Sequence, residues 1–279
     1  MGKQATISNS FTAEGKGLHI GGFSKLTFEP APIDTGIVFI KEGIKVPALY
    51  NYVFDTKRRV VLGNKDKLIS TVEHLLSAIY ALGISNLFIY VEGDEIPILD
   101  GSSVKWCELL YNAGIKIQDA ERRSFSLMDS VLIRDGNGLL LLFPSERLEI
   151  LCAISFPKSF IKWQRFYLDS LDKYFNEIAP ARTFGFYYEV EDLIKRGLIS
   201  GADLENALLV GEEGYVNLPR FFDEPVRHKI LDIIGDFSLL GMDLKMRVIS
   251  IGSGHSLHIK ALEIISNKFI EGGREFERS

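Results

Sequence analysis

The amino-acid sequence predicts an α+β protein of two domains of similar size, and three observations lead to this. Each half of the 279-residue chain gives strands, a helix, a strand and a helix in that order. A charged stretch without apolar periodicity, 118–124 (QDAERRS), separates the halves, so we place the domains at 1–120 and 125–279. The length is ample for a large buried core and favours two domains over one.

The first half combines short strands with two helices. Residues 25–29 and 36–41 alternate or run apolar between Gly, Pro and Asp residues, which is typical of strands. From Val72 to Tyr80, apolar residues recur at three- and four-residue spacing, which predicts a helix over 70–82. The rest of this half is expected as a strand at 86–92, a loop at 94–103 and a helix at 104–113.

The second half contains the strongest helix signal. Apolar residues fill most positions of 226–240, and Asp223, Glu224 and Pro225 mark the start of that helix. The other segments are strands at 126–134, 138–143 and 148–155, helical or mixed structure at 184–196 and 204–209, and two closing segments at 247–251 and 258–262.

Composition excludes several classes of function. The net charge is −5 and no long basic tract is visible, so we expect no nucleic-acid partner. The polar N-terminus lacks a signal-peptide core, and no apolar run approaches the ~20 residues of a membrane span. Cys107 and Cys152 lie in apolar surroundings without a CxxC neighbour, which predicts buried free thiols. We therefore expect a cytoplasmic protein that acts as a monomer.

Two short polar motifs, one in each half, carry the chemistry. The first is Glu73-His74 in TVEHLLSA, and the second is His228-x3-Asp232-x3-Asp236 in HKILDIIGD. Two imidazoles, a carboxylate at helical spacing and spare carboxylates are the inventory of a catalytic zinc site, which has three protein ligands, an open position and a general base.

The second motif lies on the helix predicted over 226–240, where His228 and Asp232 share one face. Burying these groups without partners costs several kcal/mol, and a divalent metal removes that cost. Gly235, which costs ~1 kcal/mol relative to Ala in a helix, indicates a close backbone approach. The alternative is an ordinary capped helix with a hydrogen-bonded His–Asp pair.

The first motif also has two interpretations. Ser70-Thr71-Val72-Glu73 matches a capping box, in which Glu73 bonds back to the cap and His74 is a core histidine. In the functional interpretation, His74 is the third ligand. Glu73, turned ~100° around the helix, is then free to take a proton from water.

Other candidate residues have functional and bland interpretations. His255, in a small-residue turn, is either a cationic imidazole kept charged by Asp236 or a surface histidine. Lys229 either pairs with a substrate phosphate or with a carboxylate at a helix end, or it is a solvated lysine. We expect His19 at the edge of a cleft and His258 in a structural role.

The chain resembles the zinc-dependent UDP-3-O-acyl-N-acetylglucosamine deacetylases of lipid A synthesis. The combination of TVEHLLSA, DGSS and HKILDIIGD is highly specific, and the motifs keep the family's order over nearly the whole chain. The motifs are GKGLHIGG (15–22), TVEHLLSAIYALGISN (71–86), EIPILDGSS (95–103), ARTFGF (181–186), EPVRHKILDIIGDFSLLG (224–241) and SGHSLHIKAL (253–262).

The resemblance implies an architecture and a reaction centre. The family fold is two α+β domains, each a sheet packed with two helices, with the active site at the domain interface. The family's zinc ligands fall on His74, His228 and Asp232, and its general base falls on Glu73.

The remaining roles concern the substrate, a UDP-linked acylated amino sugar. The charged histidine and its supporting aspartate fall on His255 and Asp236. The threonine that polarises the scissile carbonyl falls on Thr183, Phe184 packs on the sugar, and Lys229 contacts the polar head.

Two departures from the family's pattern are His258, where an asparagine is usual, and SGADLEN (200–206), where a glycine pair often precedes a serine. The second lies in the region that shapes the acyl passage, so acyl-chain length stays open. Candidates for an apolar groove are Ile194, Leu198, Ile199 and Leu204, which at helical spacing also fit plain core.

We expect an amide hydrolase that releases acetate and a free amino sugar, the committed step of lipid A synthesis. One alternative is a zinc amidase acting on another acylated nucleotide sugar. Another is a non-catalytic binding module with a structural metal, although such sites usually have four protein ligands. Iron(II) also suits two histidines and an aspartate.

Overall fold

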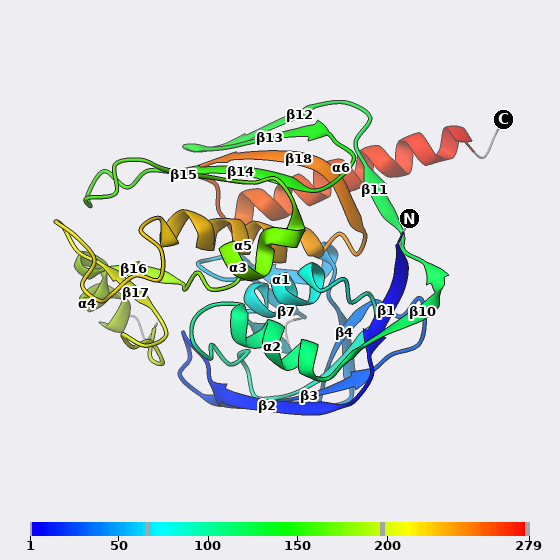
Figure 1. Cartoon of the computed structure of the whole chain (residues 1–279), viewed down its shortest axis with the longest axis horizontal. Helices are drawn as coiled ribbons and strands as arrows, with labels where there is room; N and C mark the ends of the chain where they lie inside the picture. Colours follow the sequence, from blue (N-terminus) through cyan, green and yellow to red (C-terminus); the bar gives the residue numbers. More distant parts are fainter. Residues whose placement is uncertain (1, 65–66, 196–198, 277–279) are drawn as a thin grey trace.

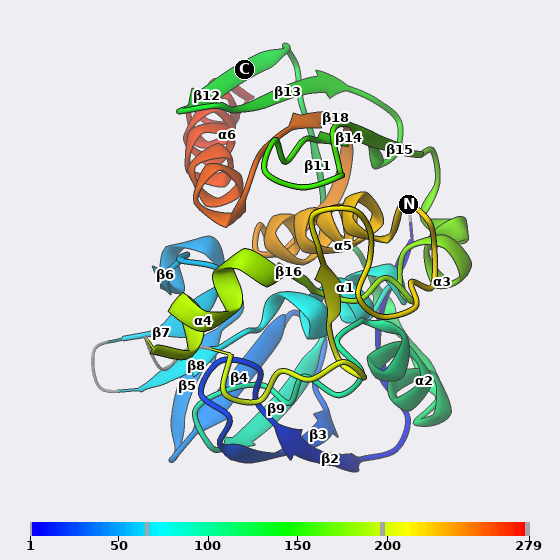
Figure 2. The same cartoon turned by 90° about the vertical axis from the view of Figure 1, so that its left-hand side faces the viewer.

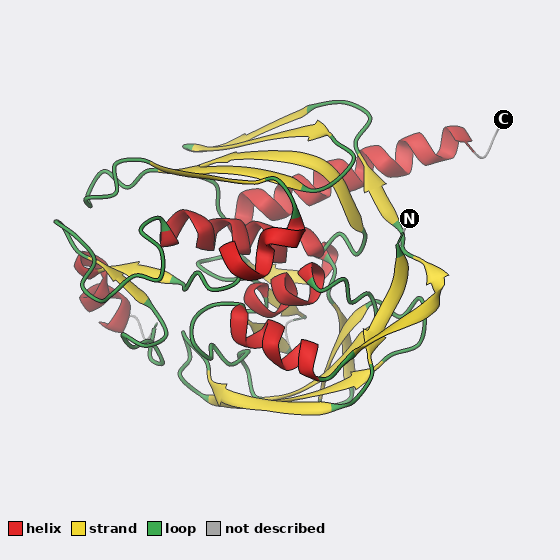
Figure 3. Ribbon diagram, viewed as in Figure 1, coloured by secondary structure: helices red, strands yellow, loops and turns green. Residues whose placement is uncertain are grey.

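The computed structural model describes residues 2–64, 67–195 and 199–276. Two open β-sheets form outer layers, and helices fill the space between them (Figures 1 and 3). Sheets with segregated helices define the α+β class, so the predicted fold class is confirmed.

The first sheet is the lower layer in Figure 1. Its strand order is β2 (Phe11–Lys16), β3 (Phe23–Pro30), β9 (Leu87–Glu92), β4 (Ile37–Lys41) and β5 (Ile44–Pro47). All neighbours pair antiparallel except β4 and β9, which are parallel. Alternate residues of β3 point inward, so Leu26 and Phe28 are buried. They belong to one hydrophobic cluster with Leu75 of α1 (Glu73–Ala81) and Trp106 of α2 (Val104–Asn112).

The second sheet is the upper layer. Its order is β12 (Val131–Asp135), β13 (Gly138–Pro144), β18 (Asp243–Ile251), β14 (Glu149–Ile154) and β15 (Gln164–Leu168), and β11 (Ser124–Ser126) pairs with β18. Two helices cover its inner face. α5 (Glu224–Ser238) packs on β14 and β15, and α6 (His255–Phe276) packs on β12 and β13.

Smaller units complete the fold. They are the pair β1 (Lys3–Ile7) and β10 (Ile115–Glu121), the ribbon β6 (Val53–Asp55), β7 (Val61–Gly63) and β8 (Leu68–Ser70), the pair β16 (Phe184–Phe186) and β17 (Leu208–Val210), the short helices η1 (Tyr50–Tyr52), η2 (Leu171–Lys173) and α3 (Tyr174–Glu177), and α4 (Tyr187–Lys195). Figure 2 shows α4 and β16 on the near side of the molecule, beside α5.

The structure confirms the long predicted elements and corrects the short ones. The helices expected at 104–113 and 226–240 are α2 and α5. The strand expected over 126–134 begins only at Val131, and 204–209 contains no helix but the start of β17. Segment 258–262 lies inside α6.

The stretch 118–124, expected between the domains, is not irregular. Its first half belongs to β10, which pairs with β1 and buries neither face completely. A strand without a buried face carries no apolar alternation, so its sequence gave no strand signal. The division into 1–120 and 125–279 stays a prediction.

The two halves meet where α1 crosses α5, at Gly235. A Cβ added there would lie within 3.0 Å of the carbonyl group of Glu73, so only glycine lets the two helices come this close. Leu75 and Ile79 of α1 belong to the same hydrophobic cluster as Ile230 and Ile234 of α5. That cluster joins residues of both sheets, and the close approach predicted from Gly235 is confirmed.

Two other expectations concern thiols and membranes. Cys107 and Cys152 are free and buried, as predicted. Within the described ranges, no helix has the length and apolar character needed to cross a bilayer.

Replacing Gly235 with alanine should lower the free energy of unfolding by about 2 kcal/mol, because overpacking outweighs the ~1 kcal/mol gain in helix propensity. Urea unfolding followed by circular dichroism measures this. Gly214→Ala is the control, since a Cβ there meets nothing within 4 Å. A variant as stable as the wild type would contradict the tight crossing.

Candidate functional site

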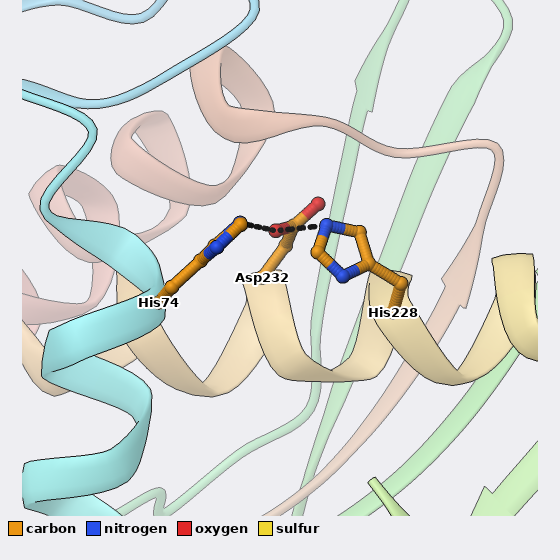
Figure 4. Close-up of side chains that lie close together, drawn as sticks. All are labelled: His74, His228 and Asp232. Carbon is orange, nitrogen blue, oxygen red and sulfur yellow. Dashed lines mark ion pairs between the residues drawn. The ribbon is translucent and has the colours of Figure 1, made fainter. Parts of the chain in front are cut away.

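Three predicted residues, His74, His228 and Asp232, converge where α1 meets α5 (Figure 4). His74 comes from α1, while His228 and Asp232 lie one turn apart on α5. The Nε2 atoms of His228 and His74 lie 3.4 and 3.9 Å from the same oxygen, Asp232 Oδ1. All three residues are buried. Ligand atoms around a tetrahedral zinc stand ~3.3 Å apart at Zn–N distances of ~2.05 Å, so the spacing fits a divalent cation.

The protonation states also suit metal ligands. Burial lowers the pKa of His74 to about 3 and lowers that of His228, so both imidazoles are neutral near pH 7. His228 Nδ1 lies 3.0 Å from the Ala181 carbonyl oxygen and donates its proton there, which leaves the Nε2 lone pair facing Asp232. Burial opposes ionisation of Asp232, but the positive charges of Lys229 and His255 outweigh it and lower the pKa of this carboxyl.

Glu73 does not form the capping box. The cap of α1 is Val72, and Thr71, with φ at 61°, donates its hydroxyl to Glu95 Oε1 at 2.6 Å. Glu73 Oε2 instead accepts from the Val60 backbone N–H at 3.1 Å. Burial raises the pKa of Glu73 to about 7, which suits a group that exchanges protons near neutral pH.

His255 faces Glu73 from the first turn of α6, with Nε2 4.0 Å from Glu73 Oε1. Its Nδ1 donates to Asp236 Oδ2 at 2.7 Å. Burial disfavours the imidazolium, but the Asp236 carboxylate outweighs it and raises the pKa of His255 to about 9. His255 is therefore buried and cationic rather than a surface loop residue. His258 donates to the same Asp236 oxygen.

Lys229 and Phe184 lie beside His74, His228 and Asp232, which we call the metal-type cluster. Lys229 Nζ pairs with Asp232 Oδ2 at 2.8 Å and lies 5.7 Å from the centre of the Phe184 ring, so it is not a solvated lysine. The backbone N–H of Thr183 donates to Gly101, which fixes the strand that carries Phe184.

His19 reaches the site from the first half of the chain. It is 6% exposed, and its backbone N–H donates to Glu95. Burial lowers the pKa of His19 to about 4, so the imidazole is neutral. Among the described residues, its Nδ1 has no hydrogen-bond partner.

One cavity of about 660 Å³ joins these residues to an apolar arm. The following predicted residues all lie on its wall: His19, Glu73, His74, Thr183, Phe184, His228, Lys229, Asp232 and His255. Asp236 is not part of this wall, because it lies behind His255.

The apolar arm contains two of the four residues that the sequence predicted for an apolar groove. Ile199 and Leu204 line it, whereas Leu198 and the side chain of Ile194 lie outside the described part of the structure. Four further residues of the arm are not marked by the patterns used above, namely Phe186, Val190, Leu193 and Leu209. The spacing of Val190 and Leu193 on α4 is a usable signal for one helical face.

Arg58 is a further residue of the cavity wall that was not predicted. It belongs to the loop between β6 and β7, and its guanidinium pairs with Glu189 of α4 at 3.1 Å. No local sequence pattern marks such a contact, because the two residues come from different halves of the chain.

Comparison with known proteins gives a consistent result. Residues 4–267 match the family model described as UDP-3-O-acyl N-acetylglycosamine deacetylase. A UDP-3-O-acyl-N-acetylglucosamine deacetylase of Nautilia profundicola is 42% identical over 274 residues, which cover 96% of this chain and 94% of the relative. Deacetylases with the same name from Sulfurimonas denitrificans (95% and 92% covered) and Myxococcus xanthus (92% and 84% covered) are each 40% identical.

The first test of the site concerns metal binding. His228→Gln should weaken Zn²⁺ binding more than ~100-fold, above the range typical of residues that only support ligands. Titration with a chromogenic chelator measures the affinity. His19→Gln is the control, since His19 lines the cavity outside the cluster of donor atoms. Unchanged affinity in His228→Gln would remove it from the ligand set.

Proposed function

Because the chain belongs to the UDP-3-O-acyl N-acetylglycosamine deacetylase family, we propose that it hydrolyses the N-acetyl group of a UDP-3-O-acyl-N-acetylglucosamine. The products are acetate and a free amine. The observation that carries this is the facing pair Glu73 and His255, 4.0 Å apart beside a cluster of metal-type donors. An apolar arm in the same cavity suits the acyl chain of this substrate.

The cofactor that we propose is Zn²⁺, held by His74, His228 and Asp232. Two neutral imidazoles and one carboxylate suit this ion and leave a coordination position open. When bound, Zn²⁺ supplies Lewis-acid polarisation of water and of the amide carbonyl.

The protein groups around this position divide the proton transfers. Glu73, whose pKa is raised to about 7, takes a proton from the attacking water as its oxygen bonds to the carbonyl carbon. Thr183, on the cavity wall, donates its hydroxyl to the carbonyl oxygen as negative charge develops there. His255 then gives its proton to the departing nitrogen as the C–N bond breaks. Asp236 stays ionised and holds the imidazole in place.

Substrate binding uses the rest of the cavity wall. The Lys229 ammonium offers charge to the polar head, and the Phe184 ring offers a flat apolar face to the sugar. His19 closes the opposite wall. The arm around Val190 and Leu193 receives the acyl chain.

A non-catalytic module with a structural metal is the weaker alternative. Among the described residues, the cluster at α1 and α5 offers three donors rather than four, and an acid–base pair stands next to it. An amidase acting on another acylated nucleotide sugar would use the same groups. We further propose that the chain works as a cytoplasmic monomer with its site between domains 1–120 and 125–279, at the committed step of lipid A synthesis.

Glu73→Gln should lower kcat by ~10²- to 10⁴-fold, because the amide has no basic oxygen to accept the proton. Release of acetate from the UDP-sugar measures this, at matched zinc content. Glu189→Gln is the control, since Glu189 lies on the cavity wall but pairs with Arg58. Near-normal turnover by a zinc-loaded Glu73→Gln enzyme would exclude Glu73 as the base.

The pH dependence of kcat/KM should be bell-shaped, with Glu73 deprotonated and His255 protonated in the active form. Because the pKa of His255 is raised to about 9, its proton is present at neutral pH and activity falls as the pH rises through about 9. Asp236→Asn removes the anion that holds this proton, so the alkaline limb should move to lower pH. An unmoved limb would assign it to another group.

A further inference from the structure

Asp236 binds two imidazoles through one oxygen. His255 Nδ1 lies 2.7 Å from Asp236 Oδ2, and His258 Nδ1 lies 2.6 Å from the same atom. The two histidines are three residues apart on α6 and so reach α5 from one helix face. Asp236 is 0% and His258 1% exposed, so water does not replace either hydrogen bond. The proposed reaction uses His255 and Asp236 but gives His258 no role.

Hydrogen bonding fixes the protonation of His258. Asp236 is ionised and only accepts, so both Nδ1 atoms carry a proton. His258 Nε2 lies 2.7 Å from Ser253 Oγ, which is 2.6 Å from Ser250 Oγ. A second imidazolium on this buried carboxylate would leave positive charge unpaired. His258 is therefore neutral, and Ser253 donates to Nε2 while accepting from Ser250.

Asp236, His255 and His258 could be mistaken for a second metal site, since their donor atoms cluster. Nitrogen–oxygen distances of 2.6 and 2.7 Å are those of hydrogen bonds. Ligand atoms on a tetrahedral zinc stand ~3.3 Å apart at the usual Zn–N bond lengths. The cluster is therefore a hydrogen-bonded group of side chains rather than a cation site.

The carboxylate of Asp236 is held on one side only. In the described part of the chain, its second oxygen, Oδ1, is buried without a hydrogen-bond partner. Both bonds that orient the carboxylate therefore run through Oδ2. If the His258 N–H is lost, only His255 remains to orient it, and His255 is the group that the carboxylate has to position.

We propose that His258 is a positioning residue, a neutral N–H donor braced by Ser253 that holds the Asp236 carboxylate so that His255 Nε2 faces Glu73 and the cavity. The catalytic meaning of that orientation rests on the proposed function. The hydrogen-bonding role itself does not.

When His258 is replaced, the direction in which the pKa of His255 shifts separates a positioning role from a simple hydrogen bond. The described ionisable groups around His255 are Glu73 and His74 on α1, Asp232 and Asp236 on α5, His258 on α6, and His19 in the loop before β3. If His258 positions Asp236, its removal lets the carboxylate turn away, and the pKa of His255 falls. If His258 only withdraws charge from a fixed carboxylate, its removal leaves a stronger anion, and the pKa of His255 stays or rises.

The experiment is an NMR titration of the His255 ring nitrogens in full-length, zinc-loaded protein carrying ¹⁵N-histidine. His258→Leu, which fills the space without a donor, should lower the pKa of His255 by about one unit, which corresponds to ~1.4 kcal/mol. It should lower kcat ~10-fold, at the low end of acid–base effects, with KM unchanged. His258→Asn, which keeps a side-chain N–H donor, should restore both values.

Ser253→Ala is a milder variant that removes only the brace on Nε2. It should shift the pKa of His255 in the same direction by a smaller amount, and it keeps the test open if His258→Leu melts below the assay temperature. An unchanged or raised pKa in His258→Leu, or in Ser253→Ala where the first variant is unfolded, overturns the proposal. Equal effects of His258→Leu and His258→Asn also overturn it. A lowered pKa with unchanged kcat would uphold the positioning role and instead contradict His255 as the proton donor.

Discussion

The close crossing of α1 and α5 at Gly235 is the constraint on which the site depends. The missing side chain lets the backbone at Glu73 rest against α5, and this brings His74 to the same oxygen that His228 faces. The same contact sets Glu73 opposite His255. The pairs His74–Asp232 and Glu73–His255 thus each join one group from each half of the chain. The contact between α1 and α5 therefore both packs the two halves together and assembles the site, since the helices that form the core also carry the site's side chains.

Burial at this crossing gives each ionisable group a defined charge. It keeps His74 and His228 neutral and raises the pKa of Glu73. It would neutralise the two aspartates as well, but Lys229 and His255 hold Asp232 ionised, and His255 does the same for Asp236. The site therefore places neutral imidazoles, a carboxyl group of raised pKa and an imidazolium side by side, and the buried Asp232 and Asp236 each pair with a positive group.

Local sequence patterns predicted what depends on local structure. The periodicity of 226–240 gave α5, and the i, i+4 spacing put His228 and Asp232 on one face. The predicted capping box is absent because its residues bond to other segments. The Thr71 hydroxyl donates to Glu95, and Glu73 accepts from the Val60 backbone N–H. The Arg58–Glu189 pair also depends on a distant partner. The roles of the site residues came from the family resemblance, since each motif alone also fitted a structural interpretation.

The apolar arm is built largely from one excursion of the chain, which leaves the body after Thr183 and returns at Leu208. The two ends lie side by side, because the Leu208 N–H donates to the Thr183 carbonyl oxygen at 2.8 Å. Between these ends, α4 supplies Val190 and Leu193, and no described residue of the excursion belongs to the metal-type cluster. Substitutions within this excursion can therefore change the length and lining of the apolar arm while His74, His228 and Asp232 stay in place.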